Sequence, residues 1–167
     1  MSRLRRLQTS GRIFFVTCNL ARTRLPFGDG DLDLLAATIE SVRKRRKFMC
    51  AGYVMMPDHW HAILVPGAAD DLPRMMNALK VASMRRINAR QGDRTPLWQP
   101  RYYDEILRKV KQFHETLRYM HFNPVEEGLV SRPEDWRWSS FHCFGGSGNS
   151  PLPVDNLNLP ANENFRL

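Results

Sequence analysis

The sequence predicts an α+β fold, a ferredoxin-like split βαββαβ sheet followed by one additional C-terminal helix. Segments rich in β-branched and aromatic residues alternate with segments of helical period, in the order strand, helix, strand, strand, helix, strand, helix. The chain has 167 residues, 43% of them hydrophobic, which suits a single domain with its own core. We expect two layers, with the helices covering one face of the sheet.

The first strand and the first helix come from the N-terminal quarter of the chain. The run RIFFVTCN at residues 12–19 is β-branched and aromatic, and it predicts a strand. Apolar residues recur at spacings of three and four over residues 32–42, which predicts an amphipathic helix. The helix runs into five consecutive cations at residues 43–47, where positive charge complements the negative end of the helix dipole.

A hairpin and a second helix follow. Residues 48–56 and 59–65 read as two strands, and only Pro57 and Asp58 separate them, so we expect a tight turn. Apolar residues of helical period over 72–90 predict the second helix, whose other side carries Lys80, Arg85, Arg86 and Arg90.

The last predicted elements are a strand at residues 102–107 and a helix at residues 110–121. After Phe144 the chain is rich in Gly, Ser, Asn and Pro, which predicts a segment without stable structure. We therefore expect one domain over residues 1–145, with a basic N-terminal arm, and a flexible tail over residues 146–167.

Charge is distributed unevenly along the chain. The sequence has 25 Lys and Arg against 17 Asp and Glu, a net charge of +8. Residues 126–167 hold six acids and three arginines, so residues 1–125 carry a net +11. A field of this sign attracts nucleic acid or an anionic membrane, and it also serves solubility.

Compartment and membrane association follow from what the sequence lacks. No apolar run reaches the roughly 18 residues that cross a bilayer, and the basic N-terminus has no hydrophobic signal segment behind it. Three cysteines without a CxxC pair support neither a disulfide framework nor a cysteine zinc site. We expect a cytoplasmic protein without membrane association.

The most distinctive local motif is His59-Trp60-His61 in the third predicted strand. Side chains alternate along a strand, so both imidazoles lie on one face and Trp60 on the other. Two neutral ring nitrogens can share one metal ion, and a pair of half-exposed histidines without a ligand would give the same pattern.

Tyr119 differs from the other tyrosines because it lies on the polar side of its helix, with Gln112 and Glu115. Asn123 comes one turn later and can bring an amide beside the phenol if the helix continues that far. Pro124 disfavours helical dihedrals at Asn123, so the sequence leaves this point open.

Four sequence blocks resemble one family. They are YVMMPDHWHAILVP, LWQPRYYDEILR, LRYMHFNPVEEGLV and PEDWRWSSF. In this order and spacing, over residues 12–144, the chain resembles the REP-associated tyrosine transposases, relatives of the single-tyrosine HUH transposases of insertion sequences. The resemblance implies the HUH transposase fold, with the catalytic tyrosine on the additional helix.

The resemblance also implies roles for four residues. In this family a His-hydrophobe-His motif on a central strand binds a divalent metal, and a helix tyrosine attacks single-stranded DNA. Here the metal ligands would be His59 and His61, and the nucleophile would be Tyr119. Relatives often have Gln as a third ligand one turn after the tyrosine, and Asn123 occupies that place. Mg²⁺ or Mn²⁺ on these ligands keeps positions open for phosphate oxygens.

The implied activity is metal-dependent cleavage and joining of single-stranded DNA through a 5′-phosphotyrosine intermediate. The implied substrate is a DNA hairpin from a repeated extragenic palindrome (REP) with a short single-stranded foot. Cations can follow its phosphates and an aromatic side chain can stack on unpaired bases, so we expect DNA contacts from Arg5, Arg6, Arg12, Lys44, Arg45, Arg85, Arg86, Arg90, Trp98 and Arg101.

Two other functions fit the same residues. A binding protein of this fold could hold hairpin DNA or RNA for regulation, with the histidines and Tyr119 in structural roles. A metal-dependent hydrolase could use the two histidines to activate water, although few acidic residues accompany them. A monomer and a homodimer can each form such a site.

Overall fold

Four antiparallel strands form the central sheet of the computed structural model, which describes residues 11–68, 70–144 and 150–159. The strands lie in the order β2-β3-β1-β4, and their bounds are β1 (Ile13–Asn19), β2 (Met49–Met55), β3 (His59–Val65) and β4 (Tyr103–Leu107). Helix α1 (Asp29–Arg46) joins β1 to β2, and helix α2 (Leu72–Gln91) joins β3 to β4. This arrangement confirms the predicted ferredoxin-like α+β fold.

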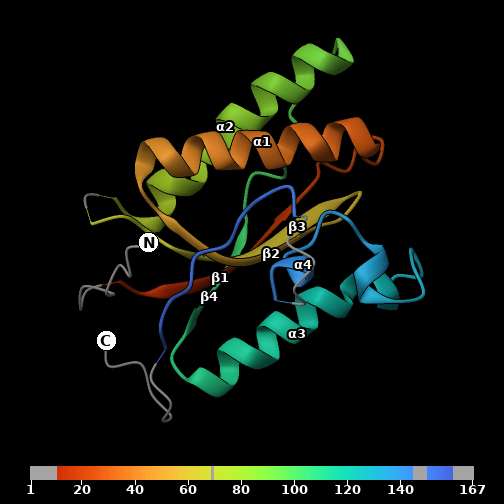
Figure 1. Ribbon diagram of the computed structural model, residues 1–167. Coiled ribbons are helices and arrows are strands. Elements are labelled where there is room, and N and C mark those ends of the chain that lie inside the picture. Colours follow the sequence, from red (N-terminus) through yellow and green to blue (C-terminus); the bar gives the residue numbers. More distant parts are fainter. Residues whose placement is uncertain (1–10, 69, 145–149, 160–167) are drawn as a thin grey trace.

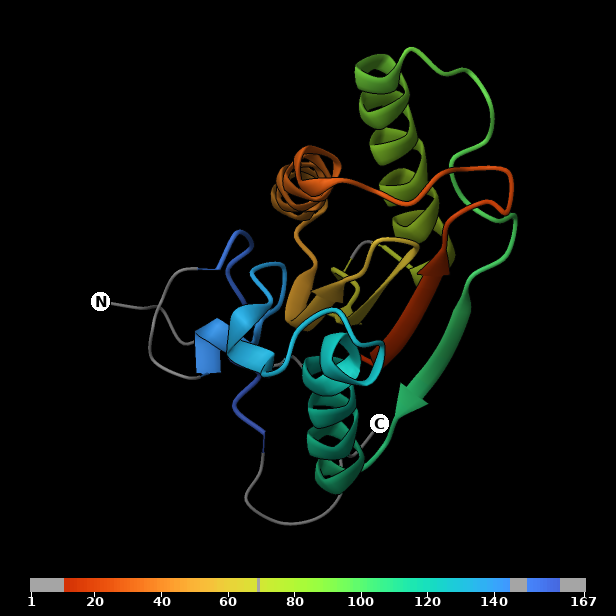
Figure 2. The same ribbon diagram turned by 90° about the vertical axis from the view of Figure 1, so that its right-hand side faces the viewer.

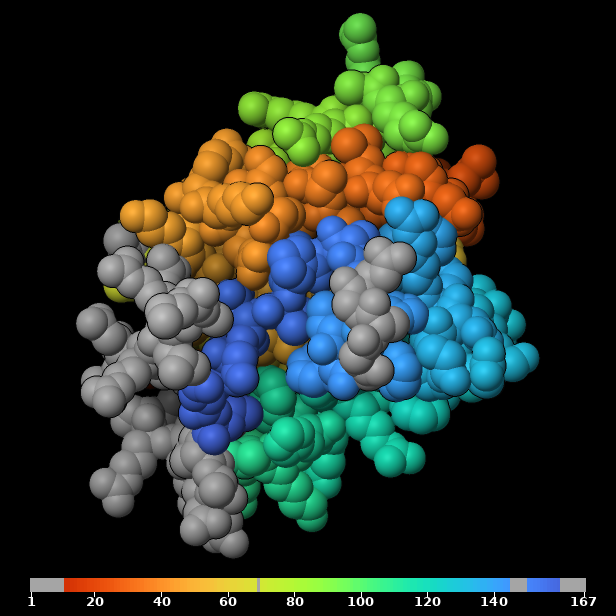
Figure 3. All heavy atoms as spheres, viewed as in Figure 1, coloured from red at the N-terminus to blue at the C-terminus, as the bar shows by residue number. Residues whose placement is uncertain are grey.

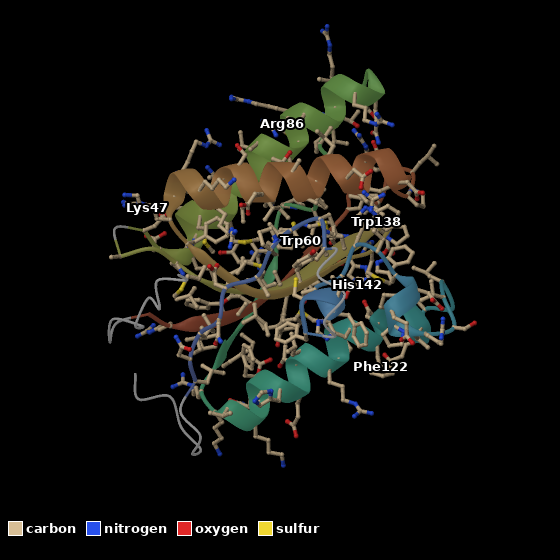
Figure 4. The ribbon with its side chains drawn as sticks, in the orientation of Figure 1. Lys47, Trp60, Arg86, Phe122, Trp138 and His142 are labelled. Carbon is tan, nitrogen blue, oxygen red and sulfur yellow. The ribbon has the colours of Figure 1, made fainter. Side chains whose placement is uncertain are left out.

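Helices cover both faces of the sheet, so the prediction of two layers is wrong. Helices α1 and α2 lie on one face, and α3 (Val110–Glu126) lies on the other (Figures 1 and 2). The first core contains Leu35, Leu79 and Trp60, and Figure 4 shows Trp60 between the sheet and α1. The second core contains Phe15 and Leu117. The reason is that β1 and β3 carry apolar side chains on both faces, and one helical layer would leave half of them in water.

Local signals fix the ends of the two longer helices. Helix α1 ends at Lys47, whose positive φ of 57° stops the helical hydrogen bonding. The side chain of Asp71 caps α2 by accepting the backbone N–H of Arg74 at 2.9 Å, and Gly92, with φ of 67°, ends it. Among the described residues no helix is long and apolar enough to cross a membrane.

Helix α3 continues through Pro124 to Glu126, five residues beyond the predicted end. Proline lacks the N–H that would bond back to the preceding turn, but its own carbonyl accepts the backbone N–H of Leu129 at 2.9 Å. Asn123 is only 4% exposed and Pro124 is also buried, so packing holds the helical conformation that the Asn-Pro step disfavours.

Gly52 lets α3 approach β2 closely. A Cβ atom at this position would lie 2.5 Å from Leu117 Cδ1 and 3.2 Å from Met120 Cε, both on α3. The pairing between β2 and β3 also shifts register between Cys50 and Gly52. The register shift in β2 and the absence of a side chain at Gly52 together set the distance between α3 and the sheet.

The chain after α3, here called the C-terminal segment (residues 127–144 and 150–159), covers the outer edge of β2. Backbone N–H groups of Met55 and Asp155 donate to Trp138 and Cys50 at 2.8 and 2.7 Å, respectively. Residues 150–159 lie between α1 and α3 on one face of the molecule (Figure 3), and Leu152 is fully buried. The structure thus differs from the expected flexible tail over 150–159, because its apolar side chains enter the core, while residues 146–149 and 160–167 lie outside the described residues.

Candidate active site

The two histidines of β3 point away from the core that holds their neighbour. Trp60 is 2% exposed among the residues packed under α1 and α2, whereas His59 and His61 face α3. This is the alternation that the sequence predicts. The Nε2 atoms of the two histidines lie 3.1 Å apart.

Helix α3 brings a third polar atom to the same point. The side-chain oxygen Oδ1 of Asn123 lies 3.1 Å from Nε2 of His59. His61 and Asn123 are 5% and 4% exposed, so these two side chains have little contact with bulk water. The cluster joins two elements, β3 and α3, that are 64 residues apart in the sequence.

The remaining ring nitrogens are held by two different partners. Nδ1 of His59 lies 2.7 Å from Oδ1 of Asp58, and a carboxylate accepts the proton of that nitrogen. Nδ1 of His61 lies 2.7 Å from the hydroxyl of Thr17 on β1. Burial and the neighbouring His59 lower the pKa of His61 to about 3, so His61 is neutral at neutral pH.

These contacts leave acceptor atoms facing one another. When each Nδ1 atom carries the ring proton, both Nε2 atoms present lone pairs, and the Asn123 oxygen adds another. Two ligand atoms about 2.1 Å from an ion and at right angles to each other lie about 3 Å apart. The donor set therefore fits one divalent cation. The described residues contain no group of three His, Cys, Asp or Glu side chains placed to hold a metal ion, so the third donor here would be the amide of Asn123.

Tyr119 lies one helical turn before Asn123, at the exposed edge of the cluster. Its side chain is 45% exposed. Its ring meets His61 edge-on, with centroids 5.5 Å apart, and contacts Phe15 of β1 at 6.3 Å. The phenol is thus open to a ligand and adjacent to the histidine pair. Tyr103 of β4 also meets Phe15 edge-on, with centroids 6.4 Å apart, and is 55% exposed.

A buried histidine on the same helix faces elsewhere. Nε2 of His121 lies 2.8 Å from the hydroxyl of Ser140, and its ring packs against Phe141. Burial lowers the pKa of His121 to about 4, which leaves it neutral. His121 therefore fastens α3 to the C-terminal segment.

Comparison with known proteins connects this geometry to a family. A family model described as "Transposase IS200 like" matches residues 8–123, which include both histidines, Tyr119 and Asn123. The chain belongs to this family of transposases. The match spans the whole sheet and most of α3.

Two curated relatives of this transposase carry a narrower name. One is the REP-associated tyrosine transposase of Escherichia coli K12, 29% identical over 91% of this chain and 90% of the relative. The other is a putative REP-associated tyrosine transposase of Haemophilus influenzae, 25% identical over 85% of this chain and 86% of the relative. They confirm the predicted resemblance and the predicted enzyme class.

Solved structures agree with the fold of the transposase. A REP-associated tyrosine transposase bound to a REP hairpin superposes with a TM-score of 0.73 at 26% identity, over 96% of both chains. A putative transposase from Deinococcus radiodurans has a TM-score of 0.54 at 18% identity, over 69% of this chain and 92% of that chain, and it supports the fold alone.

The cations predicted to contact DNA are spread over the transposase. Arg12 and Arg101 are exposed next to β1 and β4. Lys44 and Arg90 pair with Glu40 and Asp31. A second group, Arg45, Arg85 and Arg86, lies on α1 and α2, across the sheet from Tyr119, while Arg5 and Arg6 lie outside the described residues.

Trp98 belongs to the core, so its predicted stacking on DNA bases is wrong. It is 5% exposed, and its ring packs edge-on against Phe27 and Trp60. Its indole N–H donates to the hydroxyl of Ser83 at 2.9 Å. The loop before β4 turns inward here because Trp98 forms a β-bridge with Leu20.

The sequence alone does not identify Thr17 and Asp58 as partners of the histidines. Asp58 adjoins His59 in the chain, so its position is a usable signal. Thr17 reaches His61 because β1 and β3 pair in a register that sets these residues opposite each other. No local sequence pattern predicts how β1 and β3 align.

Proposed function

We propose that this transposase cuts and rejoins single-stranded DNA beside a REP-type hairpin, through a covalent 5′-phosphotyrosine intermediate on Tyr119. One observation carries the proposal: Nε2 of His59 lies 3.1 Å from both Nε2 of His61 and Oδ1 of Asn123, and the exposed phenol of Tyr119 lies beside them. The choice of a hairpin as the substrate rests on the relative whose structure was solved with a bound REP hairpin.

His59, His61 and Asn123 would hold one Mg²⁺ or Mn²⁺ ion. When bound, the ion supplies positive charge that polarises the scissile phosphate. An ion bound at Nε2 would leave each ring proton on Nδ1, where Asp58 can accept it from His59 and the Thr17 hydroxyl can accept it from His61. His61 and Asn123 are buried, whereas Tyr119 lies at the exposed edge of the cluster, so a phosphate would reach these residues from the side of Tyr119.

Tyr119 supplies the nucleophile. Its phenolic oxygen attacks phosphorus in line with the leaving 3′-oxygen, so one phosphorus–oxygen bond forms as the other breaks. The phenolic proton passes to water, and the 3′-oxygen gains a proton from water. The new phosphotyrosine is a diester like the bond that was cut, so a returning 3′-hydroxyl can reverse the step and join the strands.

The chain also fits action on DNA in the cytoplasm. Cys18 and Cys50 are buried free thiols, as is usual in a reducing compartment. The net charge of +8 favours binding of a polyanion.

A covalent adduct tests the proposal. Hairpin oligonucleotides labelled at either end are incubated with protein and Mn²⁺ and separated under denaturing conditions. Attack by Tyr119 leaves the 3′-terminal label on the protein and releases the 5′-terminal label on a free strand. Chelator and Tyr119→Phe should both abolish the adduct.

Tyr103→Phe is the matched control, because Tyr103 is an exposed phenol that also packs against Phe15 but lies on β4 rather than on α3. It should keep the adduct. An adduct that survives in Tyr119→Phe contradicts the proposal. Free 5′-phosphate ends without any adduct would indicate a hydrolase, and binding without cleavage would indicate a regulatory protein.

A further inference from the structure

A groove between α1 and α2 lies on the side of the sheet opposite to Tyr119. It has a volume of about 460 Å³, which is in the range of ligand sites. Arginines stand on both of its banks, Arg45 on α1 and Arg85 and Arg86 on α2. Its other lining residues are small or polar: Thr38, Ser41, Val42, Asn77, Ala78, Val81 and Ala82.

The three arginines differ from neighbouring cations because they have no carboxylate partner. Arg43 pairs with Glu40 and Asp155, and Arg46 pairs with Asp70. Within the described part of the chain, no ion pair involves Arg45, Arg85 or Arg86. Arg86 donates a long hydrogen bond to the hydroxyl of Thr38, at 3.4 Å. Like charges gathered without counter-charge repel each other, and an anionic ligand would remove that cost.

The groove is separate from the candidate active site. Arg86 lies on α2, on one side of the sheet, and Phe122 on α3, on the other (Figure 4). Between them stand the sheet and both cores. A DNA segment held in this groove is therefore not the segment whose phosphate lies at Tyr119.

We propose that this groove binds the phosphate backbone of double-stranded DNA. Guanidinium groups match phosphate oxygens in planar pairs, and arginines on two banks can reach phosphates of both strands. The described lining residues include no aromatic side chain, so the groove offers unpaired bases no stacking surface. A duplex keeps its bases stacked inside and presents phosphates outward, which suits this lining. The choice of DNA as the polyanion rests on the proposed function.

Binding of a blunt-ended DNA duplex, measured by fluorescence anisotropy in chelator, tests the groove without the cutting reaction. R85A/R86A should weaken binding about tenfold and reduce the log-log salt slope by about 1.8, that is about 0.9 for each phosphate that an arginine no longer neutralises. R85K/R86K should keep most of the salt slope. R74A/R137A removes the same charge from exposed, ion-paired arginines elsewhere and should change binding little.

The proposal is overturned if R85A/R86A binds duplex as the wild type does, or if R74A/R137A weakens binding equally. R85A/R86A should remain folded, which thermal unfolding checks, since both side chains are exposed and the one hydrogen bond lost, from Arg86 to Thr38, is long at 3.4 Å. Tyr119→Phe should bind duplex normally. If the wild type forms no adduct but binds duplex in a groove-dependent way, the proposed function alone is contradicted. If the wild type forms the adduct but its duplex binding does not depend on the groove, only this inference is contradicted.

Discussion

The hydroxyl of Thr17 lies 2.7 Å from Nδ1 of His61, and the two residues face each other across β1 and β3. The contact fixes the imidazole plane from a strand that carries none of the proposed metal ligands. It gives His61 an orientation that does not depend on the position of α3.

Thr17→Val should weaken metal binding without removing a ligand. The side chain keeps its shape but loses the oxygen that orients His61, and loss of such a partner costs about 10- to 100-fold in affinity. Calorimetric titration of the metal-free protein with Mn²⁺ measures the change in affinity. Thr17→Ser should restore the affinity, and an unchanged affinity in Thr17→Val would show that the contact does not orient the ring.

Asn123→Ala should weaken Mn²⁺ binding by about tenfold or more, because one of three proposed donors is lost. Asn123→Asp keeps an oxygen at the same place and adds a negative charge, so it should bind Mn²⁺ at least as tightly. The same titration checks both variants. Equal affinities in wild type and Asn123→Ala would exclude Asn123 as a ligand.

Gly52→Ala should displace α3. The added methyl group would lie 2.5 Å from Leu117 Cδ1, and such overpacking costs about 1–3 kcal/mol. Adduct formation should fall even in the folded fraction, since Tyr119 moves with the helix. Urea unfolding and the adduct assay measure the two effects. Gly28→Ala serves as the control, because a Cβ there meets no atom within 4 Å and stability should change by less than about 1 kcal/mol.

Trp98→Ala should destabilise the fold by about 3–5 kcal/mol, because it empties a buried site of a large ring. Trp98→Phe should cost less, about 1–3 kcal/mol, since it mainly removes the hydrogen bond to Ser83. Urea unfolding gives both values. DNA affinity of folded Trp98→Phe should match that of the wild type, and a selective loss of single-strand affinity would instead favour base stacking.

Leu152→Ala should destabilise the protein by about 2–5 kcal/mol, because Leu152 of the C-terminal segment is fully buried in the first core. Pro153→Ala alters an exposed neighbour and should change the free energy of unfolding by less than about 1 kcal/mol. Urea unfolding compares the two variants, and equal stability would mean that the segment does not pack as described.

The sequence predicts the order of the strands and helices along the chain and the shared face of His59 and His61, because both follow from side-chain period alone. The local pattern around Pro124 does not predict that Asn123 reaches His59, and only the family resemblance implies it. That contact requires α3 to continue through Pro124, and the burial of Asn123 and Pro124 decides this against the local preference.

Trp98 shows the same limit in a loop. Apart from Leu97, its near neighbours in the sequence are Pro96, Gln99, Pro100 and Arg101, residue types typical of a surface segment. Its burial depends on Leu20, Phe27 and Trp60, and none of these is close in sequence. The second helical layer escapes prediction for a related reason, since the period of a helix shows which side is apolar but not which face of the sheet it meets.

The alternation along β3 has a consequence for how this transposase can change over generations. Inserting or deleting one residue within β3 would exchange the two faces, placing an indole where the imidazoles stand and imidazoles in the apolar core. Neither face should tolerate the other's side chains, because one carries the proposed cation ligands and the other packs in the apolar core. Length variation should therefore be confined to the connecting loops, and β3 should accept substitutions but no single-residue insertions or deletions.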